Sequence, residues 1–323
     1  NKIVDQSSKR NEFLPLCLNS SGKIQHLQTM DRRSMLRIIK ACKPLLDNRS
    51  HKGQAGRIGI VGGSLEYTGA PYFAGISALK VGADLVHVFC ASQAANVIKS
   101  YSPELIVHPL LDKKDAITEI ITWFDRLHAI VIGPGLGRQK ETFEVVTQLI
   151  ETIKSKKIPL VIDADGLFLI TENPQLLSSF TSPVILTPNK IEFERLSNKI
   201  DVKNLEENIT ILKKGVTDVF LSQNPEVTWN LNIGGSGRRC GGQGDLLSGS
   251  IATFLHWTLT NIDKVEADII EKKSLVAAAL SSYAASSLVR LCNEKAFTLK
   301  GRSMLASDMI EHIHDAFEEL FDT

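Results

Sequence analysis

The chain has 323 residues, of which 43% are apolar and 6% aromatic, and its formal net charge is +1. This is the composition of a globular protein, and the near-zero charge provides no global field that would attract nucleic acid or an anionic membrane. The five cysteines (Cys17, Cys42, Cys90, Cys240 and Cys292) are scattered and form no C-x-x-C pair, which argues against a disulfide framework and against a zinc site.

The beginning of the chain differs in charge from the rest. Residues 1–57 contain 12 Lys/Arg against 4 Asp/Glu. We therefore predict a basic N-terminal extension at 1–51, and a single domain at 52–323. Such an extension is typical of an organelle-targeting segment and equally of a partly disordered tail. Within it, a short helix is predicted from Asp31, a candidate N-cap, to Cys42, and we expect this helix to pack on the domain.

From Arg57 onward, short Val/Ile-rich runs alternate with helical patterns, which predicts parallel strands joined by crossover helices. The predicted strands are 57–61, 85–89, 105–107, 129–132, 160–162 and 184–186, and the predicted helices between them are 72–81, 116–124, 140–154 and 191–196. Most of these strands end in Gly, Asp, Pro or Asn. Loops at such strand ends are where α/β sheets bind their ligands.

The pattern changes after Leu205, where the runs 209–213, 219–222 and 227–231 follow one another without room for crossover helices. This predicts antiparallel strands at the edge of a mainly parallel sheet. A glycine-rich stretch then opens into a long helix through Leu255, and two more helices are predicted at 274–291 and 305–320. No stretch is expected to span a bilayer, since the most apolar one, 274–291, carries five serines and is interpreted as a buried helix.

The glycine-rich stretch Gly235–Ser250 is the strongest signal of chemistry. Glycines let successive backbone N–H groups point into one concavity, and the following helix adds its unpaired donors and the positive end of its dipole. Asp245 stands on the first turn of that helix, where a carboxylate can take the proton from a hydroxyl that attacks a phosphoryl group. The alternative is that Asp245 only caps the helix and that the glycines form an ordinary loop.

Polar residues also follow three other predicted strands, and two interpretations stay open for each. Asp163 and Asp165 are candidates for orienting a metal, although Asp165 is equally placed to cap a helix that starts at Gly166. Asn189 and Glu192 are candidates for ligand contact or for capping. Lys214 is a candidate for supporting the phosphates of a nucleotide, with a surface lysine as the alternative.

The sequence lacks the motifs that are typical of several enzyme classes. No Walker A pattern and no complete G-x-G-x-x-G are present, so P-loop hydrolysis and a standard Rossmann dinucleotide site lose support. Neither H-E-x-x-H nor G-x-S-x-G occurs, which argues against zinc proteolysis and serine hydrolysis. The glycines at 62–63, 133–137 and 166 are as consistent with tight turns as with ligand contact.

Taken in order, these landmarks resemble the eukaryotic ATP-dependent (S)-NAD(P)H-hydrate dehydratases, carbohydrate-kinase-domain proteins of the ribokinase-like superfamily. The resemblance runs from about Lys52 to the last helix and rests on the segments 56–64, 66–74, 101–109, 133–137, 161–167, 186–189 and 238–249. It implies a ribokinase-like α/β fold for the catalytic domain at 52–323, with a mainly parallel central sheet flanked by helices and antiparallel edge strands near 209–231.

The resemblance also implies a reaction. ATP would phosphorylate the hydroxyl that water added to the nicotinamide ring of NADH hydrate or NADPH hydrate, and phosphate would then leave to restore NAD(P)H. Asp245 would be the base that activates this hydroxyl, and Gly241, Gly242 and Gly244 would form the anion hole for the γ-phosphate. Mg²⁺ would accompany the nucleotide.

The same resemblance implies two sets of contacts. ATP would be contacted by Lys214, Gly215, Val216, Thr217, Asp218, Gly235, Ser236, Gly237, Arg238, Arg239, Cys240, Gly241, Gly242, Gln243 and Gly244. The hydrate would be contacted by Gly135, Asn189, Lys190, Ile191, Glu192, Phe193, Glu194, Arg195 and Asp245. The matches at 216–218 and 234–237 are the weaker ones.

Two rival functions stay open at this point. A small-alcohol kinase of the same superfamily, such as a hydroxyethylthiazole or pyridoxal kinase, would use the same cradle and aspartate. A nucleotide-binding regulator without catalysis would be expected to have a substituted aspartate or a broken glycine loop. The resemblance further implies a mitochondrial or cytoplasmic location, and it is compatible with a homo-oligomer that binds neither nucleic acid nor membrane.

Overall fold

The computed structural model describes residues 32–47, 51–225, 227–265 and 272–322. The predicted N-cap Asp31 and the part of the predicted extension before it lie outside the described residues. Within them, nine strands form one sheet in the order β3-β2-β1-β4-β5-β6-β7-β8-β9. The strands are β1 (Arg57–Val61), β2 (Leu85–Cys90), β3 (Leu105–Pro109), β4 (Ala129–Ile132), β5 (Leu160–Ile162), β6 (Val184–Leu186), β7 (Ile209–Lys213), β8 (Asp218–Leu221) and β9 (Trp229–Leu231).

The sheet is parallel from β3 through β7, whereas β8 and β9 are antiparallel to their neighbours. The predicted antiparallel edge is therefore confirmed, and it begins at β8, because β7 still pairs with β6 in the parallel sense. The direction in which the chain adds strands reverses between β1 and β4. In sheets of this type, such a reversal opens a crevice at the carboxyl ends of the strands.

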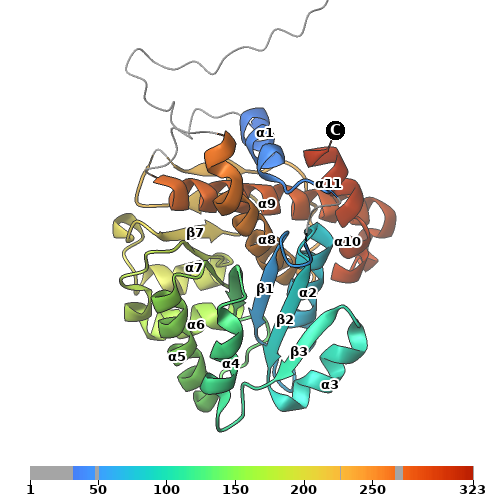
Figure 1. Cartoon of the computed structure of the whole chain (residues 1–323). Coiled ribbons are helices and arrows are strands. Elements are labelled where there is room, and N and C mark those ends of the chain that lie inside the picture. The colour runs from blue at the N-terminus through green and yellow to red at the C-terminus, as the bar shows by residue number, and fades with distance from the viewer. Residues whose placement is uncertain (1–31, 48–50, 226, 266–271, 323) are drawn as a thin grey trace, which may run out of the picture.

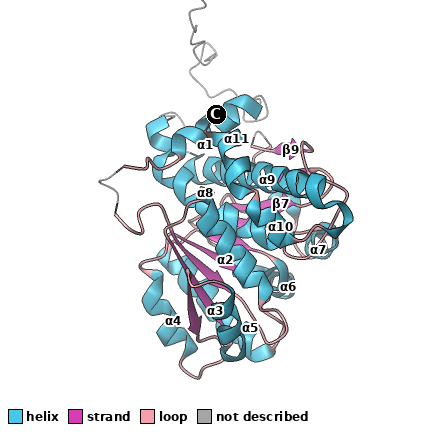
Figure 2. Ribbon diagram, turned by 90° about the vertical axis from the view of Figure 1, so that its right-hand side faces the viewer, coloured by secondary structure: helices cyan, strands magenta, loops and turns pink. Residues whose placement is uncertain are grey.

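Helices cover both faces of the sheet (Figures 1 and 2). One face carries α1 (Arg32–Cys42), α2 (Gly69–Val81), α3 (Ser92–Tyr101), α8 (Gln243–Val265), α9 (Lys273–Lys300), α10 (Ala306–Glu311) and α11 (Ile313–Phe321). The other face carries α4 (Ala116–Phe124), α5 (Lys140–Lys156), α6 (Ala164–Glu172) and α7 (Lys190–Ser197). Short 3-10 turns lie at Pro174–Leu177, Val202–Asn204 and Gly301–Ser303.

The period of two along each strand produces two separate hydrophobic cores. In β4, Ala129 and Val131 pack in the core beneath α8, while Ile130 and Ile132 pack in the core beneath α5. Because every residue of β4 is buried, its sequence is a continuous apolar run, as expected for a strand covered on both faces. The short apolar runs were thus correctly interpreted as central strands.

Helix α1 packs on the domain, as predicted. Met35, Ile38, Ile39 and Cys42 are buried in the same core as α8, α9 and α11, and the side chain of Asn261 in α8 donates a hydrogen bond to the carbonyl of Cys42 at 2.9 Å. This amphipathic helix closes one end of the helical layer, next to the C-terminal helix α11 (Figure 1).

Several helix predictions differ from the structure. Helix α3 was missed because Ala94, Ala95 and Ile98 form only a narrow buried stripe among polar residues. The last predicted helix is broken at His312, which separates α10 from α11. Helix α9 extends beyond its predicted end at 291 to Lys300.

Helix α9 also corrects the expectation about membrane spans. Among the described residues, one segment, Lys273–Ser303, is long and apolar enough to cross a membrane by length and composition alone, and 83% of its most apolar window is buried inside the protein. A buried core helix passes the same test, because burial on all sides removes the polar face that an ordinary surface helix shows. We therefore interpret α9 as a core helix.

Candidate active site

The predicted site residues meet at the carboxyl ends of the parallel strands. The amide of Gly63 after β1 donates a hydrogen bond to the carbonyl of Gly135 after β4 at 3.1 Å. The amide of Lys214 after β7 donates to the carbonyl of Pro188 after β6 at 2.8 Å. Loops that are far apart in the sequence are thereby fastened to one another around the N-terminus of α8.

Backbone packing accounts for several glycines in these loops. A Cβ on Gly133, whose φ is +122°, would lie 1.8 Å from the carbonyl oxygen of Asp163, and a Cβ on Gly62 would lie 2.1 Å from that of Pro134. Gly135, a predicted hydrate contact, would meet the carbonyl of Tyr67 at 2.4 Å in the same way. For these positions the tight-packing interpretation is confirmed, since no side chain fits.

Asp245 lies on the first turn of α8, as predicted. The amides of a first helical turn have no acceptor within the helix, so those around Asp245 are available to an anion. Burial away from water raises the pKa of the Asp245 carboxyl to about 8, the carboxylate of Asp163 raises it as well, and Lys214 opposes both. Asp245 is thus a carboxyl group poised near neutrality, which is a property of general acid–base residues.

Lys214 is the cation of this site and is not a surface lysine. Its Nζ lies 2.7 Å from Oδ1 of Asp163, and the two side chains are only 19% and 2% exposed. Burial lowers the pKa of Lys214, but the carboxylates of Asp163 and Glu192 outweigh burial and raise it above the ordinary value. A Cβ on Gly244 would lie 3.1 Å from Nζ, so the ammonium group sits directly beside the start of α8.

Asp165 does not cap a helix, contrary to one of its two interpretations. Helix α6 starts at Ala164, two residues earlier than predicted, and Asp163 occupies the N-cap position. The carboxylate of Asp165 instead accepts hydrogen bonds from the amide of Gly137 at 3.0 Å and from Nε of Arg138 at 2.9 Å. Asp165 therefore holds the loop after β4 in place.

Asn189 and Glu192 cap helix α7. The Asn189 side chain accepts hydrogen bonds from the amides of Ile191 and Glu192 at 2.9 and 3.0 Å, while the Glu192 carboxylate accepts from the amide of Asn189 at 2.8 Å. This reciprocal pair is a capping box. Burial raises the pKa of Glu192, Lys214 opposes that rise, and Glu192 thereby belongs to the same electrostatic cluster as Asp163 and Asp245.

The remaining residues predicted to contact the hydrate lie along α7. The side chains of Lys190, Ile191, Glu194 and Arg195 are exposed. Phe193 is half-buried, and the ammonium of Lys213 lies 4.4 Å from the centre of its ring. The structure therefore brings Asn189 and Glu192 to the cluster around Lys214 and presents the other side chains to solvent.

The two predicted ATP-contacting segments form a turn and a loop. In the turn between β7 and β8, the amide of Gly215 donates to Oδ1 of Asp218 at 2.9 Å, Thr217 is half-buried and Val216 is 80% exposed. Asp218 is itself buried, so it shapes this turn and offers little surface to a ligand.

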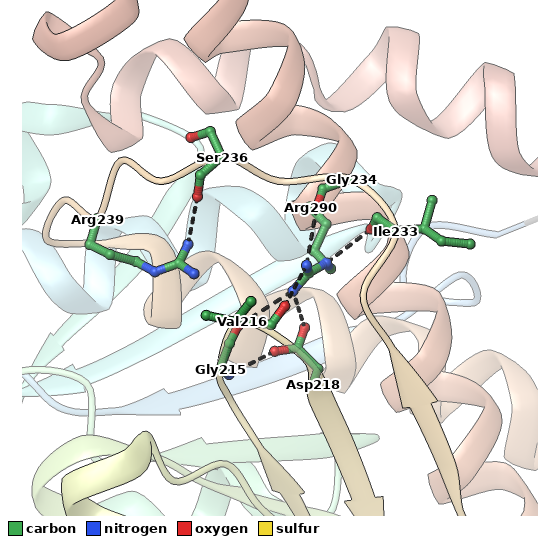
Figure 3. A network of polar contacts seen from close by, with 8 residues as sticks. All are labelled: Gly215, Val216, Asp218, Ile233, Gly234, Ser236, Arg239 and Arg290. Carbon is green, nitrogen blue, oxygen red and sulfur yellow. Dashed lines mark hydrogen bonds and ion pairs between the residues drawn. The ribbon is translucent and has the colours of Figure 1, made fainter.

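The loop between β9 and α8 is held largely by its own hydrogen bonds. The amide of Arg238 donates to Oγ of Ser236 at 3.2 Å, and Arg239 donates to the carbonyl of Ser236 at 3.1 Å (Figure 3). The amide nitrogen of the Gln243 side chain donates to the carbonyl of Arg238 and to Sγ of Cys240. No atom outside the immediate chain lies within 4 Å of a Cβ placed on Gly237 or Gly241, so this loop borders open space.

Sequence reasoning missed three residues beside this loop. Phe297 and Arg302, together with Gly237, Arg238 and Arg239, line an open cavity of about 450 Å³. Arg290 ties the loop to the turn between β7 and β8 (Figure 3). All three belong to α9 or to the turn after it. The small residues of that helix predicted only a buried core helix, so nothing in its sequence indicated that these three residues lie beside the site.

The cluster has the charge and the oxygen atoms that a divalent cation requires. Three carboxyl groups, those of Asp163, Glu192 and Asp245, surround one ammonium group, so ionisation of all three leaves an excess of negative charge. Magnesium is usually held by one or two protein carboxylates together with phosphate oxygens. Residues 32–47, 51–225, 227–265 and 272–322 contain no group of three His, Cys, Asp or Glu that could hold a metal by itself, so these carboxylates would need phosphate oxygens to complete a site.

Comparison with known proteins gives a consistent result. A sequence model of the family described as NAD(P)H-hydrate dehydratase matches residues 58–315. The chain is 49% identical over 332 residues to the ATP-dependent (S)-NAD(P)H-hydrate dehydratase of Aedes aegypti, an alignment that covers 98% of this chain and 97% of the mosquito protein. It is 48% identical over 311 residues to the Mus musculus protein of the same name, with 91% and 88% covered.

Solved structures support the fold. An ADP/ATP-dependent NAD(P)H-hydrate dehydratase from Bacillus subtilis, co-crystallised with ATP/Mg²⁺, superposes with a TM-score of 0.61 at 20% identity, covering 90% of this chain and 97% of that one. A ribokinase-like superfamily protein from Enterococcus faecalis superposes with a TM-score of 0.68 at 20% identity, covering 91% and 96%. The ribokinase-like architecture expected from the sequence is confirmed.

Proposed function

The chain belongs to the NAD(P)H-hydrate dehydratase family, and we propose that Asp245 removes the proton from the ring hydroxyl of the hydrate while the N-terminus of α8 holds the γ-phosphate of ATP. The overall reaction is the ATP-dependent dehydration of the S form of NAD(P)H hydrate, a lyase reaction that restores the reduced nucleotide. The observation that carries the proposed roles is the position of the Asp245 carboxylate, on the first turn of α8 and beside the buried Lys214–Asp163 pair.

The first chemical step is phosphoryl transfer. The hydroxyl oxygen attacks the γ-phosphorus, its proton passes to a carboxylate oxygen of Asp245, and the bond between the γ-phosphorus and the bridging oxygen breaks to release ADP. Charge develops on the phosphoryl oxygens during this step. The amides of Gly242 to Gly244 and the ammonium of Lys214 are placed to stabilise that charge, because they adjoin the same helix start.

Asp245 has to lose its own proton before it can act as a base. Its pKa of about 8 is set by burial and by the carboxylate of Asp163, so an added positive charge nearby favours the ionised form. When Mg²⁺ is bound, it supplies positive charge to the phosphate oxygens, and Asp163 and Glu192 are the side chains that would hold it. Lys214 works in the same direction from within the protein.

The second step is elimination. Hydroxide is a poor leaving group, whereas phosphate is a good one. Transfer of the phosphoryl group therefore converts the ring hydroxyl into a group that can leave. Loss of phosphate together with a proton from the neighbouring ring carbon restores the ring double bond. The products are NAD(P)H, ADP and phosphate.

The open cavity beside the loop suits the nucleoside end of ATP. Phe297 offers an aromatic face, and Arg238, Arg239 and Arg302 offer positive charge. Aromatic stacking combined with guanidinium groups is a common way to hold a base next to its phosphates. A small-alcohol kinase would use a similar cradle, but the identity to the dehydratases over nearly the whole chain does not favour that reading.

The decisive assay combines purified protein, ATP, Mg²⁺ and (S)-NADH hydrate and follows the absorbance of the reduced nicotinamide. We expect the absorbance to recover, with one ADP and one phosphate released per turnover. A stable phosphorylated product without recovery of absorbance would instead identify a kinase.

The role of Asp245 is tested by Asp245→Asn. This variant should bind ATP normally and lose turnover by a factor of roughly 10² to 10⁴, the usual contribution of a general base. Asp308→Asn is the matched control, because Asp308 is a first-turn acid of another helix, where it accepts a hydrogen bond from the amide of Leu305. Near-normal turnover by Asp245→Asn would refute the assignment of the base.

A further inference from the structure

Arg290 lies in the C-terminal half of α9 and bonds to both segments that are predicted to contact ATP (Figure 3). We propose that Arg290 is a positioning residue that fixes the distance between the turn Gly215–Asp218 and the loop that starts at Ile233, and that it does so without touching the nucleotide. The inference rests on the proposed function, since it assigns to Arg290 the geometry of the ATP site.

All of the hydrogen-bond donors of the Arg290 guanidinium group face acceptors of the protein. Toward the loop, Nε donates to the carbonyl of Ile233 at 2.9 Å, and one terminal nitrogen donates to the carbonyl of Gly234 at 3.0 Å. Toward the turn, the same terminal nitrogen donates to the carbonyl of Val216 at 2.8 Å. The other terminal nitrogen faces the carbonyl of Gly215 at 3.5 Å and Oδ2 of Asp218 at 3.3 Å.

An arginine has five N–H groups, and five acceptors surround this one. The side chains of Arg290 and Asp218 are 13% and 9% exposed. No donor is left for a phosphate, which distinguishes Arg290 from Arg238 and Arg239 at the open cavity. Its effect on ATP is therefore indirect and passes through the two backbone segments.

The backbone of the loop is shaped to meet this arginine. The amide of Gly235 donates to the main-chain carbonyl of Arg290 at 2.9 Å. Gly234 and Gly235 have φ values of +73° and +84°, and a Cβ on Gly234 would lie 3.4 Å from the backbone of Arg290. Glycine adopts backbone with positive φ readily, so the two glycines allow the loop to follow α9 at this point.

The geometry also explains why a lysine would not serve. The planar guanidinium group of arginine has donors on three nitrogen atoms and bonds to carbonyls of two segments at once. The ammonium group of lysine carries all three of its donors on one nitrogen atom. Arg290→Lys keeps the charge and loses the bridge. Comparing it with Arg290→Met separates electrostatic attraction of ATP from positioning.

The test measures ATP binding by calorimetry in the presence of Mg²⁺ and, separately, steady-state turnover of (S)-NADH hydrate. In Arg290→Met, the Kd for ATP should rise roughly ten- to hundredfold, because the turn and the loop lose the contact that orders them and have to be ordered again when ATP binds. The KM for the hydrate and the kcat at saturating ATP should change by less than about threefold, because uniform binding is what is lost. Arg290→Lys should recover little of the affinity.

Lys295→Met is the control, since Lys295 is a cation on the same helix whose ion pair, 2.9 Å to Glu319, lies away from the two segments. It should leave ATP affinity unchanged. Wild-type affinity in Arg290→Met, or full recovery in Arg290→Lys, would overturn the proposal. If Arg290→Met does not fold, Arg290→Lys and Asp218→Asn carry the test, and normal ATP binding in both would overturn it.

A wild-type protein that neither binds ATP nor restores NADH would instead overturn the proposed function. The two ideas therefore fail in different measurements.

Discussion

Replacing Lys214 by Met removes the buried ammonium group from the cluster at the start of α8. Nζ lies 2.7 Å from the carboxylate of Asp163, which is 2% exposed. Breaking a buried ion pair by removing one partner costs about 3–5 kcal/mol, because the other charge stays buried without compensation. We expect the free energy of unfolding of Lys214→Met to fall by that amount at pH 8.

The loss should depend on pH in a way that a packing defect would not. Lys214 lowers the pKa of both Asp245 and Glu192, so its removal raises the pKa of each further above that of the unfolded chain. The folded variant then binds more protons than the unfolded chain, and its stability falls as pH rises. The destabilisation relative to wild type should accordingly be smaller at pH 5 than at pH 8.

Urea unfolding at the two pH values measures both effects, with Lys140→Met as a control because Lys140 pairs with Glu144 on the surface of α5, where the two side chains are 85% and 62% exposed. The double variant Lys214→Met with Asp163→Asn should be more stable than Lys214→Met alone, since it no longer buries an unpaired charge. If the free energy of unfolding of the double variant falls by the sum of the decreases in the two single variants, the two residues do not interact, and the importance of this ion pair is refuted.

Two further predictions concern the loop and the acid side of the stability profile. Gly242→Ala should abolish ATP binding while leaving the fold intact by circular dichroism, because φ is +93° there and a Cβ would lie 2.8 Å from the ring of Phe73; unchanged ATP affinity would contradict this. Burial, followed by the neighbouring His108, lowers the pKa of His87 to about 4, below its ordinary value of 6.5, so the unfolded chain takes up the proton first. The contribution of His87 to stability is then complete above pH 6.5 and is lost by about 1.4 kcal/mol per pH unit as pH falls toward 4. In thermal unfolding across this range, His87→Phe should flatten the decline and the exposed His314→Gln should not; equal slopes in both would contradict it.

Sequence patterns predicted the sheet well because its central strands are apolar on both faces. Runs such as Ala129–Ile132 admit few alternatives, and the closely spaced runs after Leu205 left no room for helices. Helix α3 was missed because its buried stripe of Ala94, Ala95 and Ile98 is no more apolar than many loops. The local sequence pattern therefore predicted the largely buried strands and missed a helix of which only a narrow stripe is buried.

The site was predictable only where its chemistry is local. Asp245 follows glycines and opens a helix, so its place on the first turn could be predicted from neighbours in the sequence. The pair of Lys214 with Asp163 joins residues 51 positions apart, and Arg290 reaches the turn after β7 across more than 70. No periodicity or spacing records such contacts, because they are decided by the order of strands in the sheet.

The close backbone contacts at Gly62 and Gly133 affect how distant proteins of this fold should be classified as active or inactive dehydratases. These glycines are required wherever the loops after β1 and β4 touch their neighbours, whether or not a reaction takes place. A duplicated copy that had lost catalysis would keep them for as long as it kept its shape. Glycines at these positions therefore indicate a shared fold, whereas the presence of both Lys214 and Asp245 is the better indication that a related protein still has the dehydratase activity.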